Sequence, residues 1–267
     1  MALIIMVVWD TNENERTKYT KATLRCLLDT VDFTKHRLFI SDNGSCEATF
    51  NYYKVFKWAF ESKFTKENLT IKYNNENIGT SRALNFGLRS RNEGEACIKI
   101  DGDVFIHEKG WVDRLCEVID RDDTYGIVGL KRKDLLQSPN TDNEHFKSEM
   151  VMLPQVSGQR WVGVEVVADV MGTCTLFSPK LMDAIGFSEQ PSLYGFEDVL
   201  YGLRSRIAGF KNCFLFWIEI DHIDTGDKPY TQEKQQMAAD SWQEYMKWHA
   251  EYCDGTRPIY YDGGFNV

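Results

Sequence analysis

The chain has 267 residues, of which 43% are hydrophobic and 27% are charged, so it can bury the core of one large or two small α/β domains. Its 40 acidic residues outnumber its 31 Lys and Arg residues, which gives a net charge of −9. This composition excludes general disorder. It also argues against a dedicated nucleic-acid-binding protein, although a local basic groove remains compatible with it.

The segment 2–9 is apolar, but no basic residues precede it as they do in a secretory signal, and no other segment approaches membrane-spanning length. Seven cysteines are scattered along the chain, mostly in apolar segments. An odd, scattered set predicts reduced thiols and no disulfide framework. We therefore expect a cytoplasmic protein without a transmembrane segment.

Up to residue 100, short apolar runs alternate with amphipathic stretches. The runs at 3–8, 37–40, 69–73 and 96–100 predict strands. Helices are predicted between them by apolar residues at helical spacing: Leu24, Leu27, Leu28 and Val31, then Tyr52, Phe56, Ala59 and Phe60, then Leu84 and Leu88. This alternation predicts a mainly parallel sheet with helices on both faces and ligands at the carboxyl ends of the strands.

Beyond Leu130 the pattern changes. Residues 135–159 are polar and turn-rich and predict a long loop, whereas later apolar patterns predict strands at 165–171 and 213–220 and helices at 179–185, 198–207 and 232–252. The chain shows no repeat and no convincing linker. We expect one domain over 1–267, with a first half at 1–130, a second half at 131–228 and a C-terminal helix and tail at 229–267.

Two carboxylates, Asp101 and Asp103, follow the predicted strand 96–100 and are separated by the small Gly102. Hard oxygen ligands of this kind suit Mg²⁺ or Mn²⁺, and the glycine lets a diphosphate approach the backbone. The alternative is a hairpin, because Asp-Gly between apolar residues is a common turn. The preceding β-α-β pattern favours the end of a strand.

Two further segments each have both a functional and a purely structural interpretation. Glu197 and Asp198 open a predicted helix, where acids either complement the helix dipole or remove a proton from an attacking hydroxyl. His222 follows the strand predicted at 213–220 and could ligate a metal or simply be hydrogen-bonded.

The segment 75–85 is a turn that leads into a helix, whose amide groups could receive an anion with help from Arg82. A generic helix start is the alternative. Neither the glycine-rich fingerprint of nicotinamide dehydrogenases nor that of P-loop enzymes occurs in the chain.

Taken in order, these segments resemble the family 2 glycosyltransferases of the GT-A fold, from Leu3 to about Thr225. The matching motifs are the first strand and turn at 4–12, Ser-Asp-Asn-Gly-Ser at 41–45, Asn77-Ile78-Gly79 with Arg82, the Asp-x-Asp motif at 101–103, and Glu197-Asp198 with the downstream Arg204.

The resemblance implies a glycosyltransferase that moves a sugar from a nucleotide-diphosphate sugar, a UDP-sugar above all, to an acceptor hydroxyl with inversion. It implies a Mn²⁺ or Mg²⁺ ion held by Asp103 and His222, with Asp101 facing the donor or reaching the ion through water. Asp198 is the expected base, and Glu197 is the second candidate. The residues expected to bind the donor are Trp9, Asp10, Asp42, Asn77, Arg82, Asp101 and Gly102.

Trp161, Tyr194 and Phe196 are candidate acceptor-binding aromatic residues, with core packing as the alternative for each. The acceptor stays open among a glycan, a lipid-linked glycan, a protein, a small metabolite and a hydroxymethylated DNA base, the last of which needs a basic groove. A non-catalytic nucleotide-sugar or carbohydrate-binding module and a nucleotidyltransferase are the other functions considered. The joint presence of Asp103, Asp198 and His222 argues against the module, and a nucleotidyltransferase leaves the two acids at 197–198 without a task.

Overall fold

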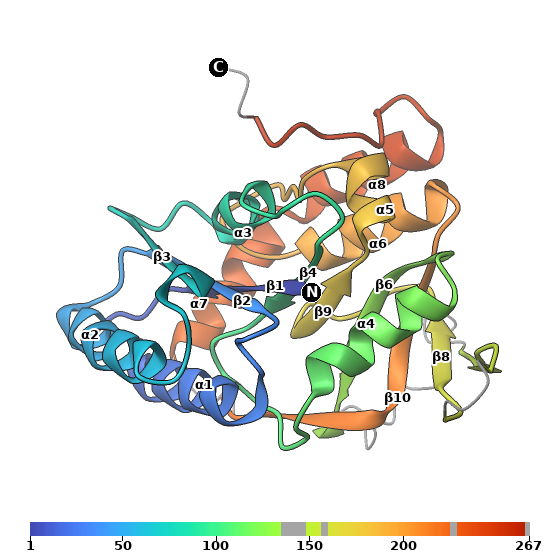
Figure 1. The fold of residues 1–267 in the computed structure, drawn as a ribbon. Coiled ribbons are helices and arrows are strands. Elements are labelled where there is room, and N and C mark those ends of the chain that lie inside the picture. The colour runs from blue at the N-terminus through green and yellow to red at the C-terminus, as the bar shows by residue number, and fades with distance from the viewer. Residues whose placement is uncertain (135–147, 156–159, 225–228, 265–267) are drawn as a thin grey trace.

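The computed structural model describes residues 1–134, 148–155, 160–224 and 229–264, and Figure 1 shows its ribbon. Ten strands of the described chain form one sheet. The strands are β1 (Ala2–Val8), β2 (Arg37–Asn43), β3 (Leu69–Asn74), β4 (Ala96–Ile100), β5 (Val104–Phe105), β6 (Tyr125–Arg132), β7 (Glu149–Met152), β8 (Gly163–Val167), β9 (Cys174–Phe177) and β10 (Lys211–His222).

Across the sheet the order is β3-β2-β1-β4-β9-β6-β10-β8-β7, and β5 pairs with the end of β10. The strands β3, β2, β1 and β4 pair in parallel, as do β6 and β10. The short strand β9 lies antiparallel between β4 and β6. The sheet therefore combines strands from both predicted halves of the chain, while the domain boundaries remain a prediction.

Helices cover both faces of the sheet (Figure 1). Those with residues in the larger core are α1 (Thr17–Thr30), α2 (Glu47–Glu61) and α4 (Trp111–Arg121), and those with residues in the second core are α3 (Thr80–Arg89), α5 (Pro179–Ile185) and α6 (Glu197–Ile207). Strand β1 supplies Ala2, Ile4, Met6 and Val8 to the first core and Leu3 and Ile5 to the second. This alternation is the period of two that a strand buried on both faces requires.

The C-terminal part adds α7 (Pro229–Asp240) and α8 (Trp242–Cys253), and a short 3₁₀ helix spans Lys66–Asn68. Tyr245 and Tyr252 of α8 pack against Leu200 and Leu203 of α6. Among the described residues, no helix has both the length and the apolar character needed to cross a membrane. The seven cysteines are all unpaired.

The predicted strands at 3–8, 37–40, 69–73 and 96–100 and the mainly parallel sheet are confirmed. The hairpin alternative at Asp101-Gly102 is wrong, because β4 pairs with β1 and β9, whereas β5 pairs with β10. This pairing separates the two strands that a hairpin would join and leaves the Asp-x-Asp motif at the end of β4.

Three predicted boundaries are wrong. The strand predicted at 165–171 is β8, which ends at Val167. The loop predicted at 135–159 contains β7, an edge strand that pairs with β8, and its parts at 135–147 and 156–159 lie outside the described residues. The helix predicted at 232–252 is two helices that meet at Ser241, whose hydroxyl bonds back to the carbonyl groups of Met237 and Ala238.

Candidate functional site

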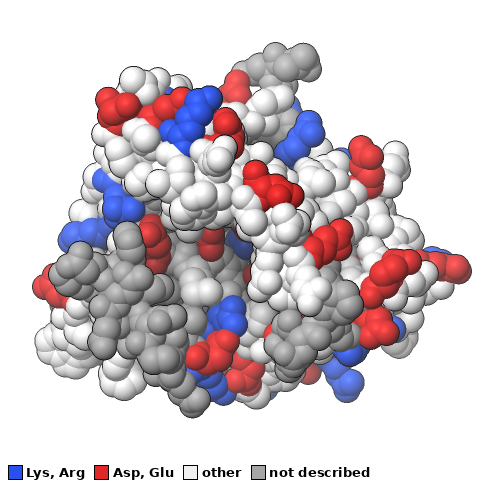
Figure 2. All heavy atoms as spheres, turned by 180° about the vertical axis from the view of Figure 1, so that it is seen from behind, with Lys and Arg blue, Asp and Glu red and all other residues white. Residues whose placement is uncertain are grey.

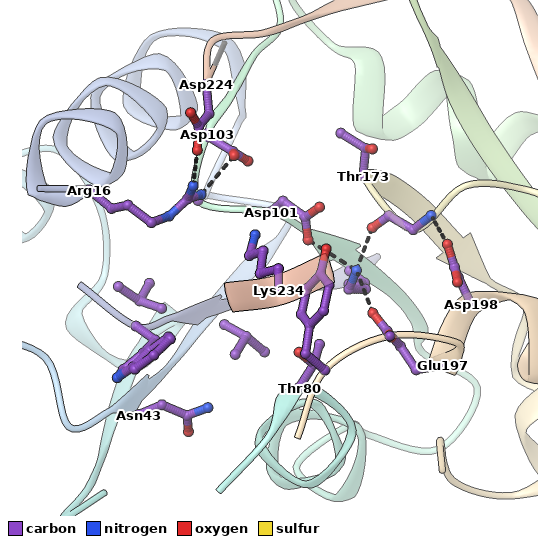
Figure 3. Close-up of a pocket in the computed structure, with 18 of the residues that line it drawn as sticks. Arg16, Asn43, Thr80, Asp101, Asp103, Thr173, Glu197, Asp198, Asp224 and Lys234 are labelled. Atoms are coloured by element: carbon purple, nitrogen blue, oxygen red, sulfur yellow. Dashed lines mark hydrogen bonds and ion pairs between the residues drawn. The ribbon is translucent and has the colours of Figure 1, made fainter. Parts of the chain in front are cut away.

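A cleft of about 470 Å³ lies where the ends of β1, β4 and β10 meet the start of α6. Asp103, His222, Asp101, Glu197 and Asp198 all line it. In Figure 3, Asp103 and Asp224 point toward Arg16 on one side of the pocket, Glu197 and Asp198 lie on the other side, and Asp101 lies between them. The fold thus brings together acids that are far apart in the sequence.

Asp103 is almost fully buried, with 3% of its surface exposed. Its Oδ2 atom accepts a hydrogen bond of 2.7 Å from Arg16 and lies 3.3 Å from Nε2 of His222, while its Oδ1 atom is buried without a hydrogen-bond partner. Burial alone would raise the pKa of Asp103, but His222 and Arg16 hold this pKa well below its ordinary value. The carboxylate is therefore charged and has one oxygen without a partner.

His222 reaches Asp103 because β5 and β10 pair antiparallel. The register places His222 opposite Val104, the residue after Asp103. Its Nδ1 atom lies 3.1 Å from the carbonyl oxygen of Asp224, so Nε2 is the nitrogen that faces Asp103. Burial alone would lower the pKa of His222, but the Asp103 carboxylate raises it above its ordinary value.

Arg16 and Asp224 are site residues that the sequence did not predict. Arg16 precedes α1, and its guanidinium group pairs with both Asp103 and Asp224. Both side chains of the Arg16–Asp224 pair are 9% exposed, so the pair is largely desolvated. One cation thus joins the carboxylate after β4 to the carboxylate that follows β10.

Lys99 is a second buried cation that the sequence analysis missed. It lies on β4, where its Nζ atom is 3.0 Å from Asp101 Oδ1 and 3.7 Å from Glu197 Oε1. Burial raises the pKa of Glu197, although Lys99 lowers it in part. Lys99 thus links the Asp-x-Asp motif to the start of α6.

Asp198 is less buried than Glu197 and also lines the cleft. Its Oδ2 atom accepts a hydrogen bond of 3.0 Å from the backbone N–H of Gly172. Gly195 and Phe196, with φ of 94° and 67°, turn the chain into α6 and so place both acids in the first helical turn. In this turn Asp198 is partly exposed, and Glu197 faces Lys99.

The residues predicted to bind the donor fall into two groups. Trp9, Asp10, Asn77, Asp101 and Gly102 line the cleft, but Asp42 and Arg82 are not among its lining residues. The Asp42 carboxylate accepts hydrogen bonds from the backbone N–H groups of Gly44 and Ser45 and from the Tyr53 hydroxyl. It therefore shapes the loop after β2, while Arg82 lies exposed on α3.

The predicted acceptor residues are also divided. Tyr194 and Phe196 line the cleft, and Phe196 also stacks on Tyr245 at 4.3 Å, so packing explains part of its environment. Trp161 lies instead at a separate cavity of about 300 Å³ beside Trp217. Lys234 of α7, which was not predicted, lines the main cleft and lies over the Tyr194 ring.

Asp103 and His222 contribute two donors to a candidate metal site. Among the described residues, no group of three or more His, Cys, Asp and Glu side chains is arranged to hold a metal ion. The Asp103 carboxylate nevertheless fits a small divalent cation, because its buried Oδ1 atom lacks a partner and its Oδ2 atom lies beside an imidazole nitrogen. Such a cation would need further oxygen ligands from a bound molecule or from water.

The sequence matches the family model "Glycosyl transferase family 2" over residues 6–186. It is also 22% identical, over 90% of its length, to the uncharacterized protein y4gI of Sinorhizobium fredii, of which it covers 27%.

Two solved structures share the fold. A mannosyltransferase from Pyrobaculum calidifontis, in complex with GDP-Man and Mn²⁺, superposes with a TM-score of 0.65 at 14% identity, covering 92% of this chain and 64% of that one. S. aureus TarS 1–349 superposes with a TM-score of 0.63 at 16% identity, covering 94% and 65% of the two chains. The chain thus spans somewhat under two thirds of the solved structures and about a quarter of the curated relative.

Proposed function

The chain belongs to glycosyl transferase family 2 and has the GT-A fold of glycosyltransferases, and from this we propose that it transfers a sugar from a nucleotide-diphosphate sugar to an acceptor hydroxyl with inversion. The observation that carries the proposal is that Asp101, Asp103 and His222 line the same cleft as Glu197 and Asp198. One side of the cleft offers groups that can bind the diphosphate of a donor, and the other side offers a carboxylate that can act as the base for the acceptor.

Asp103 and His222 are proposed to hold a divalent cation, Mn²⁺ or Mg²⁺. The proposal is supported by the buried Asp103 oxygen without a partner and by the Nε2 atom of His222 beside that carboxylate. When bound, such a cation supplies positive charge that stabilises the departing diphosphate. The mannosyltransferase structure named above contains Mn²⁺ together with its donor, which agrees with this assignment.

Protein cations add to this charge. Arg16 and Lys234 line the same cleft as Asp103. They take the role that the sequence analysis gave to Arg82, which is not among the lining residues. Burial and the neighbouring Arg16 lower the pKa of Lys234, so a bound diphosphate would favour its charged form.

Asp198 is the proposed base. Its carboxylate is open to the cleft and is held by the N–H of Gly172, whereas Glu197 is buried and faces Lys99. Deprotonated by Asp198, the acceptor oxygen attacks the sugar carbon from the face opposite the diphosphate, which inverts that carbon. Glu197 remains the second candidate for this base.

A UDP-sugar is the first donor to test and a GDP-sugar the second, because TarS has been solved with UDP-GlcNAc and the mannosyltransferase with GDP-Man. A glycan, a lipid-linked glycan or a protein remains the proposed acceptor class. On the face in Figure 2, the described Lys and Arg side chains are interspersed with acids and form no continuous stripe, so this face offers no support for a modified DNA base. A cytoplasmic location also belongs to the proposal and is supported by the unpaired cysteines.

The test is a screen of nucleotide sugars with Mn²⁺ and candidate acceptors, in which released nucleotide is measured for the wild type and for Asp198→Asn. We expect the variant to bind donor and Mn²⁺ normally but to transfer sugar about 100 to 10,000 times more slowly. Asp120→Asn, an exposed substitution on α4, is the matched control. Donor binding without turnover by the wild type would instead support a binding module, and retained transfer by Asp198→Asn would assign the base to Glu197 or to neither acid.

A further inference from the structure

Lys99 lies inside the central strand β4, and only 4% of its surface is exposed. Its ammonium group donates a hydrogen bond of 2.6 Å to the carbonyl oxygen of Gly172 and lies 3.0 Å from Asp101 Oδ1 and 3.7 Å from Glu197 Oε1. An ammonium group has three hydrogens and accepts nothing. The group therefore has one backbone hydrogen bond and two ion-pair contacts, with oxygens from three separate segments.

Gly172 connects this cation to the proposed base. Its carbonyl oxygen accepts from Lys99, while its N–H donates to Asp198 Oδ2 at 3.0 Å. The next carbonyl, that of Thr173, accepts a hydrogen bond of 3.0 Å from the backbone N–H of Asp101. The backbone at 172–173 is thus held between the Asp-x-Asp motif and the start of α6.

The space around Gly172 leaves no room for a side chain unless Lys99 moves. A Cβ atom at this position would lie 2.7 Å from Nζ of Lys99 and 3.2 Å from Cβ of Asp198. The first contact would push aside the flexible end of Lys99, and the second is tighter than most Cβ contacts. The close approach of Lys99 and Asp198 therefore depends on a glycine between them.

Burying an ammonium group costs free energy, whereas burying an apolar side chain, of the kind that fills most of β4, does not. Removing an ion from water costs several kcal/mol unless it is well paired. Burial alone would lower the pKa of Lys99, but Asp101 and Glu197 raise it above its ordinary value, so the group stays charged. Packing alone therefore does not explain a lysine at this position.

We infer that Lys99 is a positioning residue. It fixes the Gly172 backbone relative to Asp101, which lies on the donor side of the cleft. The Gly172 N–H in turn orients the Asp198 carboxylate. The inference rests on the proposed function, because the orientation of Asp198 affects the rate only if Asp198 deprotonates the acceptor. Lys99 also lines the cleft, but the inference assigns its effect to the hydrogen bond with Gly172. Its loss should slow transfer without a matching loss of donor binding.

The test compares Lys99→Met with Lys180→Met, a matched change of an exposed lysine that pairs with Asp123 at the surface. Donor Kd with Mn²⁺ and kcat for transfer are measured on the full chain. We expect Lys99→Met to lower kcat about 100-fold while donor Kd changes less than about threefold, and Lys180→Met to leave both unchanged. An unchanged kcat, or an equal loss of kcat and donor affinity, would overturn the inference.

Gly172→Ala keeps the inference testable if Lys99→Met does not fold. The new methyl group displaces Nζ of Lys99 from its place beside the Gly172 carbonyl, so we expect the same fall in kcat with donor Kd maintained. Wild-type kcat in a folded Gly172→Ala protein would contradict the inference. If the wild type is active and both variants keep its kcat, only the role of Lys99 fails; if the wild type transfers no sugar, the proposed function fails and the inference falls with it.

Discussion

The Asp103 carboxylate lies 3.3 Å from the imidazole Nε2 atom of His222, although the two residues are 119 positions apart in the sequence (222 − 103). The antiparallel pairing of β5 with β10 creates this contact, because it places His222 opposite Val104. Had the two side chains pointed into separate clefts, the proposed metal site would have been excluded. Their contact makes the site possible, and metal binding itself remains a prediction.

The first prediction concerns this pair. Asp103→Asn and His222→Ala should each weaken Mn²⁺ binding by at least about tenfold, because each removes one of the two protein donors. Isothermal titration of Mn²⁺ in the presence of a nucleoside diphosphate measures the change. His249→Ala on α8, whose ring contacts Tyr245, is the matched control. Equal affinities in all four proteins would show that the metal, if one binds, lies elsewhere.

Arg16 should compete with a divalent cation for the same carboxylates. It pairs with both Asp103 and Asp224, so Arg16→Met removes the guanidinium charge beside two largely buried carboxylates. We expect the melting temperature of the metal-free protein to fall and the increase caused by Mn²⁺ to become larger than in the wild type. Differential scanning fluorimetry with and without Mn²⁺ measures both effects.

Arg25→Met is the control for this experiment, because Arg25 lies exposed on α1, the helix that Arg16 precedes. A smaller Mn²⁺ effect in Arg16→Met than in the wild type would mean that Arg16 supports the occupied site and does not compete with the cation.

The sequence predicted the donor half of the sheet well and its centre poorly, for a physical reason. Strands β1 to β4 are visible because strands buried on both faces require continuous apolar runs. Strand β5 has two residues and β9 has four, so neither has room for a periodic signal. Their positions are set by pairing with β10, β4 and β6, which no local pattern reveals.

The same limit applies to the site. Asp101, Asp103 and His222 line the cleft and could be proposed from the sequence because they follow apolar runs, but the pairing of Arg16 with Asp224 depends on contacts between distant segments. Lys99 was open to prediction, since a lysine inside the buried run 96–100 is unusual. Helix α4 was missed although Trp111, Leu115 and Val118 recur at helical spacing and are buried.

Arg204, which the sequence analysis matched to the family's Glu-Asp motif, is expected to stabilise the fold. It is fully buried and donates hydrogen bonds to the carbonyl groups of Ile185, Phe187 and Ile259. Arg204→Met removes one hydrogen-bond donor from each of these three carbonyl groups and empties a fully buried position, so we expect the free energy of unfolding to fall by about 4 kcal/mol. Urea unfolding measures the loss.

The same variant should loosen the C-terminal segment. Ile259 lies two residues before Tyr261, which forms a β-bridge with Gly186, so loss of the Arg204 bond to Ile259 weakens the attachment of this segment. Hydrogen exchange at 259–261 should therefore accelerate relative to the wild type. Arg206→Met, a change of a more exposed arginine on the same helix, is the matched control. If both variants lose the same stability, the carbonyl contacts of Arg204 are not the cause.

Asp10 gives a pH-dependent prediction. Burial raises its pKa from 3.8 to about 6, although hydrogen bonds from Thr20 and Thr49 and the charge of Arg16 lower it in part. Between these two values the folded chain binds more protons at this site than the unfolded chain. The contribution of Asp10 to stability is therefore greatest below pH 4 and falls as the pH rises through about 6.

Asp10→Asn removes this titration, because an amide has no proton to lose in this range. The stability of the variant relative to the wild type should therefore rise by about 2 to 3 kcal/mol between pH 4 and pH 7.5, since each pKa unit corresponds to about 1.4 kcal/mol. Urea unfolding of both proteins at the two pH values gives this difference directly, and titrating groups common to both cancel. Asp29→Asn, on the exposed side of α1, is the matched control. If the stability of Asp10→Asn relative to the wild type is the same at both pH values, the Asp10 carboxyl titrates alike in the folded and unfolded chains. Its burial between α1 and α2 would then carry no electrostatic cost.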